Sequence, residues 1–147
     1  MNSKPPFIGQ ESPETCALAC LRMLLAHHGC NATESELRAI CDVTEHGTHI
    51  EELCRVARQV GFAARIEEAI DIADLEHHHA RGLFPIVYLN RQPIDGELST
   101  HSVVIVRVTP RFVVFLDPLR GERRCSRKKF LQAWGMLNRL ALICDAS

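Results

Sequence analysis

Residues 10–29 read QESPETCALACLRMLLAHHG and carry the clearest helix signal in the chain. Leucines recur at helical spacing after a polar start around Pro13, and Gly29 follows the last residues of the pattern. The pattern predicts a helix from about Pro13 to His28. Cys16 then lies in the first turn, where the helix dipole and unpaired backbone N–H groups favour a thiolate over a neutral thiol.

Outward from this helix, the first half of the chain has helical patterns and the second half is rich in strands. Two capping-box spacings, Thr33 with Glu36 and Thr48 with Glu51, predict a short helix ending near Cys41 and a longer one over 49–60. Apolar runs and turn residues predict strands at 62–66, 84–89, 101–108, 112–116 and 137–143, helices at 72–80 and 127–134, and a loop at 90–99. The strands at 101–108 and 112–116 flank a short turn and form a predicted hairpin, and the last strand is expected to close the sheet.

Composition indicates one ordinary domain over residues 1–147. The chain has 147 residues, of which 46% are hydrophobic and 24% charged, so it can bury a core. The formal net charge of −1 gives no general attraction to nucleic acid or to an anionic membrane. No apolar run approaches the roughly 20 residues that span a bilayer, so we expect no direct membrane insertion.

Seven cysteines and eight histidines raise the question of disulfides or metal. An odd cysteine count and the lack of an export signal predict free thiols in a reducing cytoplasm. Cys16 and Cys20 stand four residues apart, but no second ligand pair accompanies them, so we expect no metal site and no cofactor. Residues 77–79 are consecutive histidines and are expected on a solvated surface. The remaining helix and strand cysteines are expected in the core: Cys20, Cys41, Cys54 and Cys144.

Three polar residues complete a hydrolytic pattern with Cys16. Gln10 precedes Cys16 by six residues, so its amide can reach the same oxyanion as the helix N–H groups. His101 opens an apolar strand after a polar loop, and Asp117 ends the next strand. An antiparallel hairpin returns Asp117 to the level of His101, where a carboxylate can orient an imidazole base.

The chain resembles the papain-like cysteine peptidases that form the N-terminal domain of bacteriocin exporters and cut leader peptides after a double glycine. The resemblance covers nearly the whole chain and rests on these residues: Gln10, the run from Cys16 to Leu24 with Gly29, Gly47-Thr48, Val60-Gly61-Phe62, Phe84 to Val87, His101 to Val104, Asp117-Pro118 with Gly121, Phe130, and Trp134-Gly135. It implies an α+β papain-like fold, with an N-terminal helical lobe packed on a small antiparallel β-sheet.

By the same resemblance, Cys16 is the nucleophile, His101 the general base and then acid, Asp117 its orienter, and Gln10 an oxyanion donor. No cofactor is implied. The implied partners are a peptide or protein substrate and a separate ABC-type exporter, and nothing in the sequence indicates an oligomeric state. Two positions depart from the family pattern: Thr15 stands where an acidic residue is usual, and Ala17 where glycine is common.

The exporters continue into transmembrane helices and a nucleotide-binding domain, whereas this sequence ends at Ser147 without a P-loop. We therefore expect a free-standing cytoplasmic member, reaching a membrane only through a transporter partner, or a piece of a longer protein. A basic run at 120–129 is expected to steer an acidic peptide. It has no aromatic residue before Phe130, so we do not expect nucleic-acid binding.

Other interpretations stay open. Cys16 and His101 are also compatible with core packing at a helix start and a strand start, Asp117-Pro118 with a simple turn, and Gln10 with a solvated segment. The chain could then be a catalytically idle domain that binds a peptide or docks on a transporter. A deamidase or acyltransferase would use the same triad as a peptidase.

Overall fold

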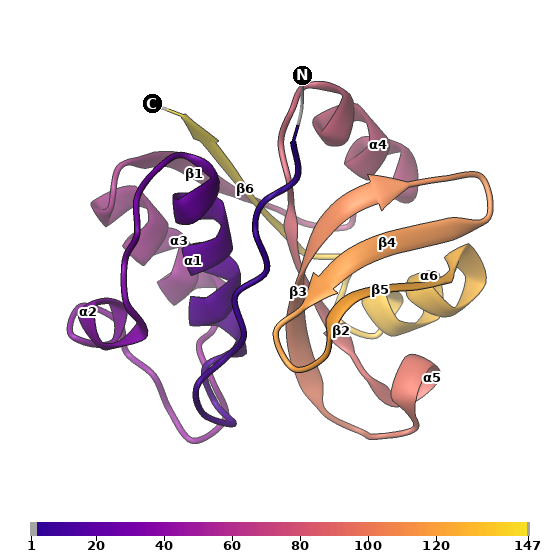
Figure 1. Ribbon diagram of the computed structural model, residues 1–147. Helices are drawn as coiled ribbons and strands as arrows, with labels where there is room; N and C mark the ends of the chain where they lie inside the picture. Colours follow the sequence, from indigo (N-terminus) through magenta and orange to yellow (C-terminus); the bar gives the residue numbers. More distant parts are fainter. Residues whose placement is uncertain (1–2, 147) are drawn as a thin grey trace.

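The computed structural model describes residues 3–146 and consists of a six-stranded antiparallel sheet with helices on both faces (Figure 1). The helices are α1 (Cys16–His27), α2 (Glu34–Arg38), α3 (Ile50–Gln59), α4 (Ile72–Ala80), α5 (Gln92–Asp95) and α6 (Arg127–Gly135). The strands are β1 (Phe62–Glu67), β2 (Ile86–Asn90), β3 (Thr100–Val108), β4 (Phe112–Asp117), β5 (Gly121–Ser126) and β6 (Ala141–Ala146).

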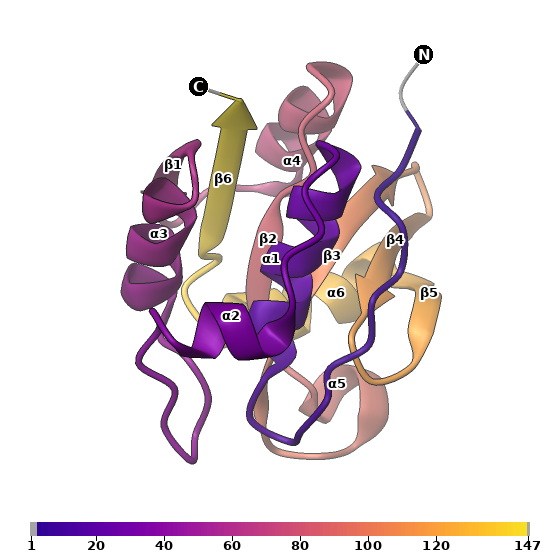
Figure 2. The same cartoon turned by 60° about the vertical axis from the view of Figure 1, so that its left-hand side comes forward.

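The sheet order is β1-β6-β2-β3-β4-β5. Helix α1 lies against β3 on one face, and α3 covers β1 and β6 beside it (Figure 2). Helices α4 and α6 cover the other face. Because successive side chains of a strand point to opposite faces, Val104 packs in the core under α1 whereas Val103 packs in the core under α6. The α+β architecture predicted from the sequence, with the helical lobe packed on an antiparallel sheet, is confirmed.

Helix α1 begins at Cys16, three residues later than the predicted start at Pro13. The preceding residues form a tight turn instead. The Thr15 hydroxyl donates to the carbonyl of Ser12 at 3.0 Å, and the backbone N–H of Ser12 donates to the same hydroxyl at 3.1 Å. Cys16 is therefore the first helical residue, which places it still closer to the positive end of the helix dipole.

Of the two predicted capping boxes, one is confirmed. Thr33 and Glu36 cap α2 reciprocally. At α3 the N-cap is His49, which makes no capping side-chain hydrogen bond, so the predicted box of Thr48 and Glu51 is wrong. The Thr48 hydroxyl lies instead 3.8 Å from the Cys41 sulfur in the core.

The second half follows the predicted order with three corrections. The predicted loop at 90–99 contains the short helix α5, and the basic run at 120–129 forms strand β5 and the first turn of α6. The last strand begins at Ala141 rather than residue 137, because Asn138 and Arg139 adopt left-handed backbone angles (φ 60° and 47°) that no strand accommodates. It also lies inside the sheet, between β1 and β2, and not at an edge.

An irregularity in the hairpin of β3 and β4 decides the geometry of the site. Near the turn, Val108 pairs with Val113, whereas farther along Val104 pairs with Leu116. The register therefore changes between residues 105 and 107, where β3 carries one extra residue. A one-residue change in register reverses which side chains of one strand share a face with a given side chain of the partner strand.

With this bulge, Asp117 is level with Val103, two residues from the predicted level at His101. Val103 and His101 alternate onto the same face of β3, so the carboxylate meets the imidazole on a diagonal. Without the extra residue, Asp117 would be level with Val104 and would point to the opposite face. The bulge is thus what allows the two side chains to meet.

The core holds the cysteines assigned to it. Cys20, Cys41, Cys54 and Cys144 are all buried and unpaired. The prediction that the histidines at 77–79 are solvated is wrong for His78, which is 4% exposed and shares a 2.7 Å hydrogen bond with Glu67. It follows Ile72 and Leu75 on the buried side of α4. Within residues 3–146, every helix is too short or too polar to cross a bilayer.

Candidate active site

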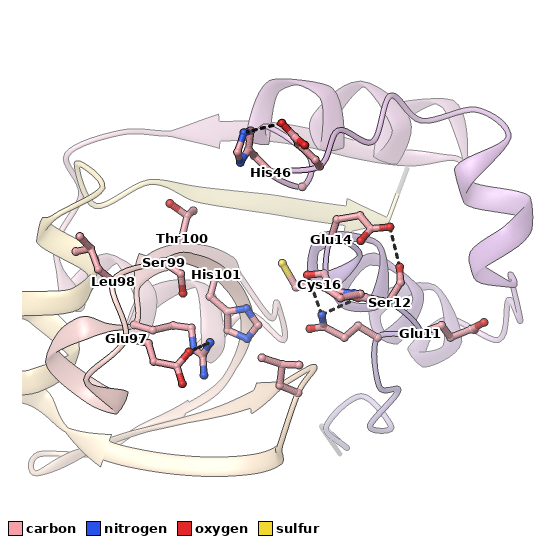
Figure 3. Close-up of a pocket in the computed structure, with 16 residues that line it drawn as sticks. Glu11, Ser12, Glu14, Cys16, His46, Glu97, Leu98, Ser99, Thr100 and His101 are labelled. Atoms are coloured by element: carbon pink, nitrogen blue, oxygen red, sulfur yellow. Dashed lines mark hydrogen bonds and ion pairs between the residues drawn. The ribbon is translucent and has the colours of Figure 1, made fainter.

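Cys16 and His101 line one cleft between the helical lobe and the sheet (Figure 3). The cleft measures about 670 Å³ and contains Gln10, the turn at 12–14 and residues 97–101. A second cleft of about 510 Å³, with Tyr88 and residues 136–138 in its wall, shares Cys16 and His101. Cys16 and His101 therefore lie where the two clefts join and can be reached from either cleft.

His101 is held by Asp117 in a buried pair. Nε2 of His101 lies 2.7 Å from Oδ1 of Asp117, and the two residues are 5% and 1% exposed. The backbone N–H of Leu119 donates to the same carboxylate oxygen at 2.9 Å. Because Asp117 occupies Nε2, Nδ1 is the ring nitrogen that remains for Cys16.

The electrostatics of the three groups favour a proton on the imidazole. Burial lowers the pKa of His101, but the hydrogen bonds and charges of Asp117 and Cys16 outweigh it and raise that pKa to about 9. Burial raises the pKa of Cys16, yet His101 and Ser102 bring it below its ordinary value. Against its burial, His101, Leu119 and Arg123 lower the pKa of Asp117 to about 2. The shifts move the proton from sulfur to the ring.

Arg123 holds the second oxygen of Asp117, a role that the sequence analysis missed. Its guanidinium donates to Oδ2 of Asp117 at 2.9 Å and to both oxygens of Asp95 at 2.6 and 3.1 Å. Arg91 and Arg120 lie 3.4 and 3.6 Å from Asp95. Pro118 marks a turn in the sequence, but it is the pairing of Asp117 with Gly121 in the structure that shows a strand returning Arg123 to the carboxylate.

The basic run at 120–129 is therefore divided in the structure. Arg123 points to the triad carboxylate, Arg120 to Asp95, and Arg127 lies 3.4 Å from Glu76. Four cations of the run lie at exposed positions: Arg120, Arg124, Lys128 and Lys129.

Gln10 lines the cleft, but its amide is engaged. Nε2 donates to the carbonyls of Ser12 and Pro13 at 2.8 and 3.3 Å, so both amide hydrogens face the turn before α1. Its Oε1 is buried and has no hydrogen-bond partner. The main-chain N–H of Gln10 donates to Pro118 at 3.0 Å, which ties the N-terminal segment to the turn after Asp117. In this conformation Gln10 does not offer the free donor that the sequence predicted.

Ser102 also belongs to the site and was not predicted. It follows His101 on the opposite face of β3, has no exposed surface, and donates a 3.1 Å hydrogen bond from its hydroxyl to the Cys16 sulfur. Strand alternation would have placed it toward α1, but nothing local in the sequence indicates that it meets a sulfur. Within the described part of the chain, no three histidine, cysteine or acidic side chains are arranged to hold a metal ion.

Comparisons with known proteins agree with this architecture. The sequence profile of the peptidase C39 family matches residues 4–146. The chain is 31% identical over 124 residues to the colicin V secretion/processing ATP-binding protein CvaB of Escherichia coli, an alignment that covers 84% of this chain and 16% of that protein. It is 25% identical over 128 residues to the lactococcin-G-processing and transport ATP-binding protein LagD of Lactococcus lactis, covering 87% and 17%. The chain thus spans about a sixth of the length of these curated relatives.

Solved structures show the same fold. A double glycine motif protease from an AMS/PCAT transporter, in complex with its leader peptide, superposes with a TM-score of 0.79 at 21% identity, covering 99% of this chain and 94% of that one. The peptidase domain of Streptococcus ComA gives 0.76 at 23% identity, covering 95% and 97%. The predicted papain-like fold is confirmed, and the chain belongs to the peptidase C39 family of cysteine peptidases.

Proposed function

We propose that this chain hydrolyses a peptide bond after a double glycine in a leader peptide, using a triad of Cys16, His101 and Asp117. The observation that carries the proposal is the meeting of these three side chains at the junction of two clefts, with the cysteine at the first position of α1. The order of the groups, from sulfur to imidazole to carboxylate, is that of an activated nucleophile with its base and orienter.

In the first step, the Cys16 thiolate attacks the carbonyl carbon of the scissile bond and a carbon–sulfur bond forms. The carbonyl oxygen becomes an oxyanion. The first N–H groups of α1 have no carbonyl one turn earlier within the helix, so they are available to receive that charge. Gln10 joins them once substrate binding turns its amide away from Ser12 and Pro13.

In the second step, protonated His101 gives its proton to the departing amine as the carbon–nitrogen bond breaks. A water molecule, deprotonated by His101, then attacks the thioester and releases the acyl product and the thiolate. Asp117 stays ionised throughout, since its pKa of about 2 lies far below neutral pH. Its carboxylate stabilises the imidazolium that carries the proton between the two steps.

The relatives support the choice of substrate class. CvaB and LagD are secretion or transport proteins that process their cargo, and one structural neighbour is a double glycine motif protease bound to a leader peptide. By analogy, we propose a leader peptide as substrate and an ABC-type exporter as partner for this chain. Because the chain spans a small part of those relatives, their activity is carried over for the peptidase step alone.

Two measurements test the proposal. The first is the rate at which limiting iodoacetamide labels each cysteine as a function of pH, followed by peptide mass spectrometry. We expect single rapid labelling at Cys16 that persists below neutral pH and slows in His101→Ala. The second is mass spectrometry of synthetic peptides whose leader ends in Gly-Gly, incubated with wild-type chain or with Cys16→Ala. We expect cleavage after the second glycine by the wild-type chain only.

The other outcomes separate the alternatives. If Cys16 labels no faster than an ordinary thiol, the catalytic proposal is lost, and binding of the same peptides without cleavage would favour an idle binding domain. If Cys16 is activated but the products are an acyl-amine adduct, or glutamate in place of glutamine, the chain is an acyltransferase or a deamidase.

A further inference from the structure

The sulfur of Cys16 accepts a hydrogen bond from a residue outside the triad. Ser102 lies directly after His101 in β3 and is completely buried, and its hydroxyl donates to Cys16 Sγ at 3.1 Å. A serine hydroxyl has a single hydrogen. Once that hydrogen is directed to the sulfur, it is not available to any other acceptor, so the orientation of this hydroxyl is fixed by Cys16.

Cys20 is the next cysteine along α1. It follows Cys16 by one turn and is completely buried. Burial and the charges of Cys16 and Asp117 raise the pKa of Cys20 well above its ordinary value, so it remains a thiol. A neutral thiol is a weak acceptor, so the Ser102 hydroxyl directs its hydrogen to Cys16.

We propose that Ser102 is a positioning residue for the nucleophile: its buried hydroxyl donates to the Cys16 thiolate and keeps the sulfur at the mouth of the cleft beside His101. This inference rests on the proposed function, because it assigns a role only to a sulfur that reacts as a thiolate. A hydrogen bond donated to the charged form of a group stabilises that form.

The other groups that face Cys16 leave this role to Ser102. His101 faces the sulfur from β3, with Asp117 acting through it from β4, and Tyr88 faces it from β2. The Tyr88 hydroxyl donates to the carbonyl of Thr48 at 2.7 Å, so its hydrogen points elsewhere. Cys20 disfavours a second negative charge nearby. Within the described residues, His101 and Ser102 are the groups that lower the pKa of Cys16.

The test compares the pH profile of iodoacetamide labelling at Cys16 in the wild-type chain, Ser102→Ala and Ser102→Thr. Ser35→Ala, at an exposed position of α2, is the control. We expect Ser102→Ala to raise the midpoint of the profile by about one pH unit, and thus to slow labelling about tenfold below the midpoint. Rates at alkaline pH should coincide, because every variant is then fully ionised. Ser102→Thr, which keeps the hydroxyl, should restore the wild-type midpoint, and Ser35→Ala should not move it.

Two results would overturn the inference. An unchanged midpoint in Ser102→Ala would show that the hydroxyl does not stabilise the thiolate. A uniform loss of rate at all pH values, together with a lower melting temperature, would show that Ser102 only fills space under α1. Both results leave the proposed function intact as long as Cys16 of the wild-type chain labels rapidly below neutral pH. If wild-type Cys16 behaves as an ordinary thiol, it is the proposed function that fails.

Discussion

The two walls of the cleft are built differently. The sheet wall carries His101 at the start of β3, and the helix wall consists of the start of α1 and the preceding segment with Gln10. On the sheet wall, His101 is bonded to Asp117, Asp117 to Arg123, and Arg123 to Asp95, through buried or half-buried contacts of 2.6 to 2.9 Å. On the helix wall, Gln10 directs both amide hydrogens to its own turn and leaves its Oε1 buried without a partner. The base is therefore fixed in place, whereas the oxyanion donor is not.

This difference indicates where substrate binding changes the molecule. A fully bonded polar network keeps its geometry because every group would lose a partner on moving. A buried carbonyl oxygen without a partner is unfavourable by about 1–3 kcal/mol, and giving Gln10 Oε1 a partner offsets part of the cost of turning its amide away from Ser12 and Pro13. We infer that in the free protein His101 already has its catalytic position, whereas the Gln10 amide is not directed at the oxyanion. Peptide binding then turns that amide toward the oxyanion. Four predictions test this comparison.

The largest effect is expected at His101. His101→Ala should lower kcat by about 10⁴-fold, because the base, the acid and the counter-charge of the thiolate are lost together. The pKa of Cys16 should rise, so iodoacetamide labelling at neutral pH should slow as well. Both are measured by peptide cleavage and by labelling.

His77→Ala is the matched control, since His77 is exposed on α4 and lines neither cleft. It should leave both rates unchanged. Turnover by His101→Ala within tenfold of the wild-type rate would mean that the sheet wall does not supply the base.

Asp117→Asn should lower kcat on the order of 10³-fold, with little change in KM, because an amide neither fixes the tautomer of His101 nor stabilises its cation. A loss confined to KM would contradict the assigned role. The variant also tests the pKa of about 2 for Asp117 through stability.

A carboxylate whose pKa is lower in the folded protein than in the unfolded chain, where it is about 3.9, stabilises the fold above that value. The contribution is lost as the pH falls toward about 2. The drop in melting temperature between about pH 4 and pH 2 should therefore be smaller in Asp117→Asn than in the wild-type chain. Folding raises the pKa of His101 and lowers that of Cys16, so their contributions to stability change in opposite directions as the pH rises through the alkaline range. The acid range is therefore the informative one.

Most of the sheet wall could be predicted from sequence, because strand patterns and turns are local. The start of β3 at Thr100 and the end of β4 at Asp117 agree with their predicted positions within one residue. The same is true of α4, whose bounds match the prediction. Local patterns are therefore enough to predict that His101 and Asp117 lie at the same end of one hairpin.

What could not be predicted depends on register and on contacts distant in sequence. The bulge in β3 decides whether Asp117 and His101 share a face, and no residue type marks it. Arg123 resembles any surface cation until β5 pairs with β4 and turns its side chain to Asp117. The side chain of Gln10 follows from a turn whose hydrogen bonds hold its acceptors in place.

Gln10→Ala tests the helix wall and should have a smaller effect than either change in the triad. Loss of one of several oxyanion donors lowers kcat by about 10²-fold, the low end of the usual range, because the helix N–H groups remain. Labelling of Cys16 in the absence of peptide should not change, since the amide is directed to Ser12 and Pro13 in the free protein. Slower labelling of the free variant would show that Gln10 already acts on the sulfur, and the contrast between the two walls would be lost.

The smallest effect is expected from Arg123→Met, which removes the cation behind Asp117 but leaves the triad itself complete. The adjacent Arg124→Met is the matched control, because Arg124 lies on the same strand, exposed, over the ring of Phe112. Loss of one charge-assisted hydrogen bond should lower kcat about tenfold and raise the pKa of Asp117, so that activity declines at a higher pH on the acid side. A purely structural role would lower the melting temperature without moving that acid limb. Equal kcat values and equal pH profiles for the two variants would show that Asp117 needs only its bonds to His101 and Leu119, and that the fixed part of the sheet wall ends at the triad.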